Sequence, residues 1–375
     1  MNKKILLALI ICLSVPIQGF AESSSVADLV QRLGIRESDA ASRDMPGWSR
    51  PSLITVLIYR DFPTSGVGST EWIREVVDGV TIEFIDGRHG IDYAQMSDSD
   101  VYVGWCVPAA IEAGDNLDYL HIFAAGVDRC ASIPNIIERG LIVTNSAKAA
   151  SETIAEHSIA LMLALSRNLH AHHSAQLKSD WGRDIPGTPP AVSVSGKTML
   201  VLGLGGIGRQ VARRAHDLGM RVIGTRNSSR TGPDYVDYVG LSDEMTKLAG
   251  EAHVVVNALP LTKLTRGIVN AEFFDAMTDG SYYITVGRGA TTDTDALMAA
   301  LNSGKLSGAG LDVTNPEPLP KDHELWTMPN VLITPHTAAS SELSQRNTII
   351  IARENLRRYV RGERLLNLVD LTRGY

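Results

Sequence analysis

Short apolar runs alternate with polar and helical stretches along most of the chain. After Ser52 the first series of runs comprises LITVLIY, VTIEFI, DVYVGW, LHIFAA and GLIVTN. A second series, which starts at Thr198, comprises TMLVLGLG, MRVIGT, HVVVNAL, GSYYITVG, LSGAGLDV and NVLITP. Short strands that alternate with helical segments are typical of parallel sheets with helical crossovers. The pattern therefore predicts two parallel sheets, one in each half of the chain.

Three further segments have the apolar spacing of helices. Residues 151–178 contain neither Pro nor Gly and predict one long helix that connects the two halves. A final helix is predicted near 340–361, and the chain after Thr337 must pack on one of the halves. The apolar positions of residues 26–33 predict a short amphipathic helix in an otherwise polar N-terminal extension, 22–52. We expect this extension to be a surface appendage.

The first 21 residues have the three parts of a signal peptide. Lys3 and Lys4 precede an apolar stretch, and the small residues around Ala21 form a cleavage site. The stretch is shorter than the roughly 20 residues that span a bilayer, so no stable membrane insertion is expected after cleavage. Export is favoured. The alternatives are an uncleaved leader or a wrongly assigned start codon, which would leave the protein in the cytoplasm.

Composition narrows the class of ligand. The chain of 375 residues is 44% hydrophobic and 21% charged, which suits two globular domains. A formal net charge of -7 argues against a general nucleic-acid or acidic-membrane binder and favours a small substrate. Cys12 would leave with the leader. Cys106 and Cys130 remain, an even number that an oxidising compartment would allow to pair. Because a domain of this size needs no disulfide, we expect them to be free, buried thiols.

A glycine motif follows the first apolar run of the second half. Gly203, Gly205 and Gly208 form GxGxxG between a predicted strand and a predicted helix, with Gly206 and Ile207 at the head of that helix. The first glycine permits the turn, the second lets backbone N–H groups approach a pyrophosphate, and the third allows close helix packing. The motif predicts a dinucleotide site with the phosphates at a helix N-terminus.

The loop after the next predicted strand bears on the choice of cofactor. No Asp or Glu lies between Leu218 and Pro233, although an acid there would bind the ribose hydroxyls of NAD. Thr225, Arg226, Ser228 and Arg230 instead offer hydroxyls and cations that suit a 2′-phosphate. The sequence therefore predicts a preference for NADP(H), with NAD(H) possible. The alternative is a solvated polar loop.

Three polar residues follow later apolar runs. Arg288, Glu317 and His336 each come just after a predicted strand, where ligands bind in open α/β sheets. Taken alone, an arginine, glutamate or histidine at such a position more often has a structural than a catalytic role. No GxSxG motif occurs, and the histidines at 170, 172 and 173 lack further ligands nearby, so neither a serine hydrolase nor a metal site is predicted.

Together these motifs resemble the D-isomer-specific 2-hydroxyacid dehydrogenases over about residues 53–375. The blocks AEHSIALMLALSRN, ALPLTKLTRGIV, LDVTNPEPLP and PHTAAS carry the resemblance. The arginines after the second strand, Trp105 and the terminal TRGY are most similar to the glyoxylate and hydroxypyruvate reductases. One departure is Thr285, where many members of the family have Asn.

The resemblance implies roles for individual residues. Arg288 would hold the substrate carboxylate, His336 would donate the proton, and Glu317 would favour the protonated ring. Backbone N–H groups of Ala125 and Gly126 would grip the carboxylate, and Trp105 would line the substrate pocket or belong to the core. Further cofactor contacts would come from Leu259, Pro260, Thr265, Val286, Gly287, Arg288, Asp312 and His336.

The expected architecture is two doubly wound, Rossmann-like α/β domains with the active site in the cleft between them. Residues 53–149, completed by 337–375, would form the substrate domain, and 150–336 the cofactor domain. The resemblance implies a homodimer that reduces a small 2-keto acid to the D-2-hydroxy acid. The alternatives are a formate or phosphonate dehydrogenase and a non-enzymatic, nucleotide-sensing protein similar to a corepressor.

Overall fold

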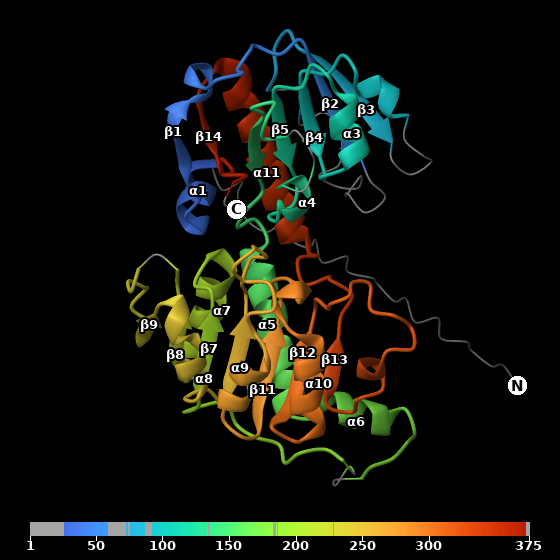
Figure 1. Cartoon of the computed structure of the whole chain (residues 1–375), viewed down its shortest axis with the longest axis vertical. Coiled ribbons are helices and arrows are strands. Elements are labelled where there is room, and N and C mark those ends of the chain that lie inside the picture. Colours follow the sequence, from blue (N-terminus) through green and yellow to red (C-terminus); the bar gives the residue numbers. More distant parts are fainter. Residues whose placement is uncertain are drawn as a thin grey trace, which may run out of the picture.

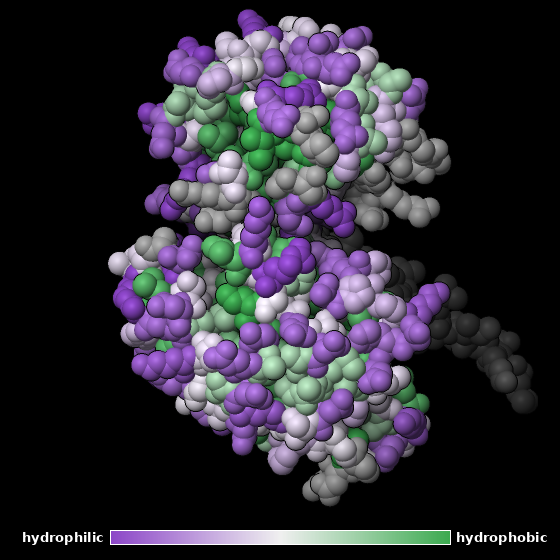
Figure 2. Space-filling model, in the orientation of Figure 1, coloured by the Kyte–Doolittle hydropathy of each residue, from purple (hydrophilic) through white to green (hydrophobic). Residues whose placement is uncertain are grey.

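A computed structural model describes residues 26–372 apart from 59–72, 74–75, 87–91, 132, 134–135, 183–184, 186 and 228. The predicted leader, Ser228 and most of the terminal TRGY lie outside the described residues. Figure 1 shows two lobes, one above the other, each built on its own sheet. On the face seen in Figure 2, the surface narrows between the lobes and hydrophilic residues predominate there. None of the helices in the described part of the chain is long and apolar enough to cross a membrane.

The first lobe contains a five-stranded parallel sheet in the order β3-β2-β4-β5-β6. Its strands are β2 (Leu53–Ile58), β3 (Thr81–Asp86), β4 (Val101–Gly104), β5 (Tyr119–Ile122) and β6 (Ile142–Asn145). The short helices α3 (Pro108–Ala113) and α4 (Asp128–Ala131) follow β4 and β5. All five predicted apolar runs of the first half are therefore confirmed as strands.

The second lobe contains a seven-stranded parallel sheet in the order β13-β12-β11-β10-β7-β8-β9. Its strands are β7 (Thr198–Leu202), β8 (Arg221–Thr225), β9 (Tyr238–Gly240), β10 (Val254–Asn257), β11 (Ser281–Thr285), β12 (Leu306–Leu311) and β13 (Val331–Ile333). The sequence predicts six of them and misses the three-residue edge strand β9. The order reverses at β7, and ligands of open α/β sheets bind at such a switch point.

Helices cover both faces of the second sheet. One apolar cluster joins sheet residues to Leu248 of α8 (Met245–Ala249), Phe273 of α9 (Ala271–Ala276) and Leu297 of α10 (Thr294–Asn302). A second cluster on the other face includes residues of α5 (Ser151–Ser166) and α7 (Gly206–Asp217). Strands buried on both faces are nearly continuous apolar runs, as the sequence has them. The predicted doubly wound α/β fold is confirmed.

The predicted long connecting helix is interrupted. Helix α5 ends at Ser166, and α6 (Leu169–Gln176) starts after Asn168, whose φ of 54° is left-handed. Asn tolerates this conformation better than most residues, and its Nδ2 donates to the carbonyl of Pro189 at 2.7 Å. The prediction of a single helix over 151–178 is wrong in extent because one residue redirects the chain.

The N-terminal segment is part of the first lobe. Helix α1 (Val26–Leu33) confirms the predicted amphipathic helix, and β1 (Glu37–Ala41) pairs antiparallel with β14 (Arg364–Leu366) near the C-terminus. Leu29 and Leu33 share an apolar cluster with Ile351 and Leu366. The prediction of a surface appendage is therefore wrong: its strand is too polar to be recognised alone and forms only because β14 lies beside it.

The last long helix returns the chain to the first lobe. Helix α11 (Glu342–Arg361) begins at the N-cap Ser341 and ends at Gly362, whose φ is 68°. Its residues Ala352, Leu356 and Tyr359 pack in one apolar cluster with strand residues of the first sheet. The first lobe is thus assembled from both ends of the chain, as Figure 1 shows.

Candidate active site

The glycine motif forms a tight turn between β7 and α7. Gly203 has a φ of 89°, and a Cβ on Gly208 would lie 2.0 Å from the carbonyl oxygen of Gly203. A Cβ on Gly205 would meet nothing within 4 Å, so this part of the backbone is open. The turn therefore fits the phosphates of a dinucleotide, which need an uncovered backbone at the start of a helix.

The residues after β8 have different surroundings. Thr225 is buried, and its Oγ1 accepts a hydrogen bond from the Gly203 nitrogen at 3.3 Å, so it supports the turn. Arg226 is half-buried and donates to the carbonyl of Thr231 at 2.7 Å. Arg230 instead contacts Glu244 at 2.5 Å. Among Thr225, Arg226 and Arg230, only Arg226 is neither buried under the turn nor paired with a carboxylate among the described residues.

His336 and Glu317 form a direct pair. Glu317 follows β12 and His336 follows β13, and the distance from Nδ1 of His336 to Oε1 of Glu317 is 2.8 Å. Both side chains are partly exposed. Since Glu317 engages Nδ1, the other ring nitrogen, Nε2, is the one that could meet a substrate oxygen. The structure therefore brings together two of the three predicted catalytic residues.

A buried aspartate shapes the loop that carries His336. The carboxylate of Asp312 accepts hydrogen bonds from the Thr334 hydroxyl at 2.7 Å and from the nitrogens of Thr337 and Ala338 at 2.9 and 3.1 Å. Its carbonyl accepts from the His336 nitrogen at 2.8 Å. These bonds help to hold His336 at its left-handed φ of 55°, so Asp312 positions the loop. Its predicted contact with the cofactor stays a prediction.

Arg288 reaches from the second lobe to the first. Its Nε donates to Oδ1 of Asp128 at 3.1 Å, and its Nη1 donates to the carbonyl of Gly287 at 3.0 Å. A Cβ on Gly126 would lie 1.6 Å from Nη2, so the guanidinium lies directly against the loop of residues 123–128. Asp128 is a partner of Arg288 that sequence reasoning missed. The acidic residue at the end of the FAAGVD segment was the available signal.

The remaining predicted cofactor residues lie on two neighbouring loops of the second lobe. Leu259, Pro260 and Thr265 follow β10, whereas Val286 and Gly287 follow β11. A Cβ on Gly287 would lie 2.5 Å from the Leu259 carbonyl oxygen, so the two loops touch. The Thr265 hydroxyl donates to the carbonyl of Pro260 at 2.6 Å. Both loops are at the carboxyl edge of the sheet, and β10 is the direct neighbour of β7, the strand that leads into the glycine turn.

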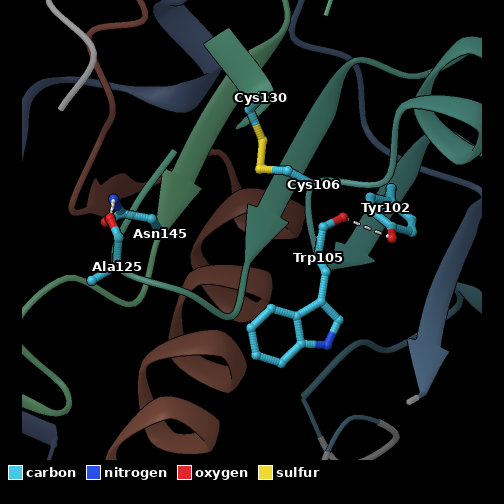
Figure 3. Close-up of a disulfide and its surroundings, with 6 residues drawn as sticks. All are labelled: Tyr102, Trp105, Cys106, Ala125, Cys130 and Asn145. Atoms are coloured by element: carbon cyan, nitrogen blue, oxygen red, sulfur yellow. Dashed lines mark hydrogen bonds between the residues drawn. A yellow bond between two sulfur atoms is a disulfide. The ribbon is translucent and has the colours of Figure 1, made fainter. Parts of the chain in front are cut away.

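The loops after β4 and β5 contain the residues predicted to bind substrate and are shown in Figure 3. Trp105 follows β4, is 37% exposed and meets the Phe123 ring edge-on at 6.2 Å. The Trp105 carbonyl accepts from the Tyr102 hydroxyl at 2.9 Å, and the Ala125 carbonyl accepts from Nδ2 of Asn145 at 2.7 Å. The exposed ring is not part of the core, and its place in the wall of a substrate pocket stays a prediction.

A disulfide joins these two loops. Cys106 and Cys130 are bonded, with a distance of 5.1 Å between their Cα atoms, which is within the usual range. The prediction of two free thiols is therefore wrong. Cys106 follows β4 and Cys130 lies in α4 after β5, and these strands are neighbours in the sheet. Only the order of the strands brings the two cysteines together.

The histidines near α6 do not form a metal site. His170 Nε2 contacts the Pro329 carbonyl oxygen at 3.0 Å, which ties the helix to the loop before β13. Within the described ranges, no group of three His, Cys, Asp or Glu residues is placed to hold a metal ion.

Comparisons with known proteins agree with this geometry. A family model described as "D-isomer specific 2-hydroxyacid dehydrogenase, NAD binding domain" matches residues 159–338. The human glyoxylate reductase/hydroxypyruvate reductase is 31% identical over 67% of this chain and 76% of its own length. A D-3-phosphoglycerate dehydrogenase of Methanocaldococcus jannaschii is 34% identical over 70% of this chain, which spans only 49% of that relative.

A solved structure of a relative has the same overall fold. The NADPH-dependent glyoxylate/hydroxypyruvate reductase of Sinorhizobium meliloti, in complex with NADP and sulfate, aligns with a TM-score of 0.71. It is 26% identical, and the alignment covers 86% of this chain and 99% of the other. On the fold, the glycine turn, the histidine–glutamate pair and these comparisons, the chain belongs to the D-isomer-specific 2-hydroxyacid dehydrogenase family, whose members are nicotinamide-dependent oxidoreductases.

Proposed function

We propose that the protein uses NADPH to reduce a small 2-keto acid, of the size of glyoxylate or hydroxypyruvate, to the D-2-hydroxy acid. The observation that carries the proposal is the pair of His336 and Glu317 at 2.8 Å beside the carboxyl edge of the sheet. A carboxylate at Nδ1 fixes the orientation of the ring and leaves Nε2 to face a carbonyl oxygen, as a proton donor to that oxygen requires.

Each residue contributes one part of the reaction. NADPH, when bound, supplies the hydride that adds to the carbonyl carbon. His336 gives the proton on Nε2 to the carbonyl oxygen, which becomes the hydroxyl group. Arg288 binds the substrate carboxylate, because a guanidinium can donate two parallel hydrogen bonds to it. Asp128, at 3.1 Å from Nε, holds the guanidinium against Gly126 and so aims it at the junction of the lobes.

A substrate and cofactor panel tests the proposal. Glyoxylate, hydroxypyruvate, pyruvate and 3-phosphohydroxypyruvate would each be assayed with NADPH and with NADH, by the loss of absorbance of the reduced cofactor. We expect the highest kcat/KM with NADPH and one of the small unphosphorylated acids. Preference for the phosphorylated acid would favour a phosphoglycerate dehydrogenase. Reduction of NAD+ or NADP+ by formate or phosphite, in a parallel assay with the oxidised cofactors, would favour a formate- or phosphonate-type dehydrogenase. Absence of turnover with every compound tested would favour a non-enzymatic, nucleotide-sensing protein.

We also propose that the protein is exported and loses residues 1–21. The tripartite leader supports this, and so does the bond between Cys106 and Cys130, because disulfides persist in oxidising compartments. N-terminal sequencing of native protein should start at Glu22, and an intact Met1 on cytoplasmic material would refute export. A homodimer, expected from the family, is tested by light scattering of the purified protein.

A further inference from the structure

Four cationic side chains gather at the phosphate end of the glycine turn. Lys148 packs against the turn, since a Cβ on Gly206 would lie 2.8 Å from its Cγ. Its Nζ donates a hydrogen bond to the Gly34 carbonyl oxygen, which places the segment that contains Arg36 beside the same turn. This segment belongs to the first lobe because Arg36 directly precedes β1. In Figure 1, α1 is the part of the first lobe that approaches α7 and β8.

The other two cations belong to the second lobe. Arg209 lies in the first turn of α7, three residues after Gly206, so the two share a face of the helix. Arg226 follows β8, whose last residue accepts a hydrogen bond from the Leu204 nitrogen at 2.9 Å. Arg209 and Arg226 therefore flank the turn on the second-lobe side.

These charges lack anionic partners within the described part of the chain. Arg214, Arg221 and Arg230 all pair with glutamates, whereas no ion pair joins Arg36, Lys148, Arg209 or Arg226 to a carboxylate among the described residues. Like charges that remain close together without a counter-ion destabilise the fold, and groups perturbed in this way cluster at functional sites.

The repulsion among these cations contributes to lowered pKa values at Lys148 and Arg226. Burial lowers the pKa of Lys148, and repulsion from Arg36 and Arg209 lowers it further. Burial likewise lowers the pKa of Arg226, with added repulsion from Arg209 and Arg36. The backbone of Lys148 also has a left-handed φ of 72°, a conformation that is unfavourable for a lysine. A bound polyanion would relieve the repulsion among all four.

We propose that Arg36, from the first lobe, contacts the 2′-phosphate of NADPH together with Arg226, while Lys148 and Arg209 contact the pyrophosphate. This inference rests on the NADPH preference of the proposed function and extends it: recognition of the phosphorylated cofactor depends on a residue outside the cofactor-binding sheet. Lys148 is assigned to the pyrophosphate because it touches Gly206, and Arg226 to the ribose end because it follows β8. NADPH would then connect the two lobes.

The test compares two substitutions in the same segment. Arg36→Gln removes the proposed contact. The hydrogen bond that the backbone carbonyl of residue 36 accepts from the Asn367 nitrogen is unaffected. Arg32→Gln is the matched control, because Arg32 lies in α1 but forms an ion pair with Glu152. Dissociation constants of NADPH and NADH would be measured by quenching of protein fluorescence. Arg36→Gln should weaken NADPH binding about tenfold or more, the effect of one charge-assisted hydrogen bond, and change NADH binding much less.

A second measurement needs no substitution. Hydrogen exchange of the amides in residues 34–37 of the unmodified protein should slow when NADPH is added and much less when NADH is added. NADPH binding by Arg36→Gln as tight as that of the Arg32→Gln control would overturn the inference and leave the NADPH preference standing. Equal binding of NADPH and NADH by the unmodified protein would instead overturn the cofactor preference itself, and the role of Arg36 with it.

Discussion

The disulfide between Cys106 and Cys130 should stabilise the first lobe and keep the loops after β4 and β5 in place. The double variant Cys106→Ser with Cys130→Ala removes the bond without leaving a single reactive thiol. Cys130 is fully buried in an apolar cluster, where Ala is a tolerable replacement. Treatment of the unmodified protein with a phosphine reductant gives the same loss of the bond without any substitution.

The size of the effect follows from the length of chain that the bond closes. The cysteines are 24 positions apart, and the loop-closure relation gives about 3.5 kcal/mol for a loop of that length at 25 °C. Native domains are stable by only about 5 to 15 kcal/mol, so this loss is a large fraction of the total. We expect the urea midpoint of the first lobe to fall markedly, as monitored by tryptophan fluorescence.

The same change should affect substrate more than cofactor. Cys106 adjoins Trp105, and Cys130 lies two residues after Asp128, which holds Arg288 at 3.1 Å. Loosening both loops should therefore raise KM for the 2-keto acid severalfold and leave the dissociation constant of NADPH nearly unchanged. The reductant should have no effect on the double variant. Oxidised and reduced protein with the same urea midpoint and the same KM would refute this reasoning.

Three further predictions concern single side chains. His336→Ala should lower kcat by about 100-fold or more, the usual scale of general acid catalysis, and near-normal turnover would exclude His336 as the proton donor. Asp312→Asn should destabilise the fold by about 1 to 3 kcal/mol and lower kcat with little change in the dissociation constant of NADPH, because an amide oxygen is a weaker acceptor for the loop bonds; equal kcat would remove its positioning role. Burial lowers the pKa of His121 to about 3, so the folded state stays neutral while the unfolded state takes up a proton below about pH 6.5. Stability should therefore fall with decreasing pH, by about 2 kcal/mol more between pH 7 and pH 5 than in His121→Asn, and equal pH dependence in urea unfolding would contradict this origin.

The sequence alone determined most of the strands and where the candidate catalytic residues lie relative to them. Apolar runs identify eleven strands of the two large sheets, because a strand buried on both faces must be apolar along its whole length. The glycine turn is also predictable, since Gly203 has a left-handed φ and a Cβ on Gly208 would collide with the Gly203 carbonyl oxygen. His336, Glu317 and Arg288 were found because residues just after parallel strands gather at one edge of the sheet.

Only the tertiary structure decided which of these side chains have partners. The bond between Cys106 and Cys130 and the contact of Asp128 with Arg288 depend on strand order and on how the lobes meet, which leave no periodic signal. The pairing of β1 with β14 is similar, because ESDAA is polar and becomes a strand only beside residues more than 300 positions away. The pattern of apolar and polar residues in a segment reflects whether its faces are buried. A contact between two distant segments depends instead on where the crossover connections place them relative to each other.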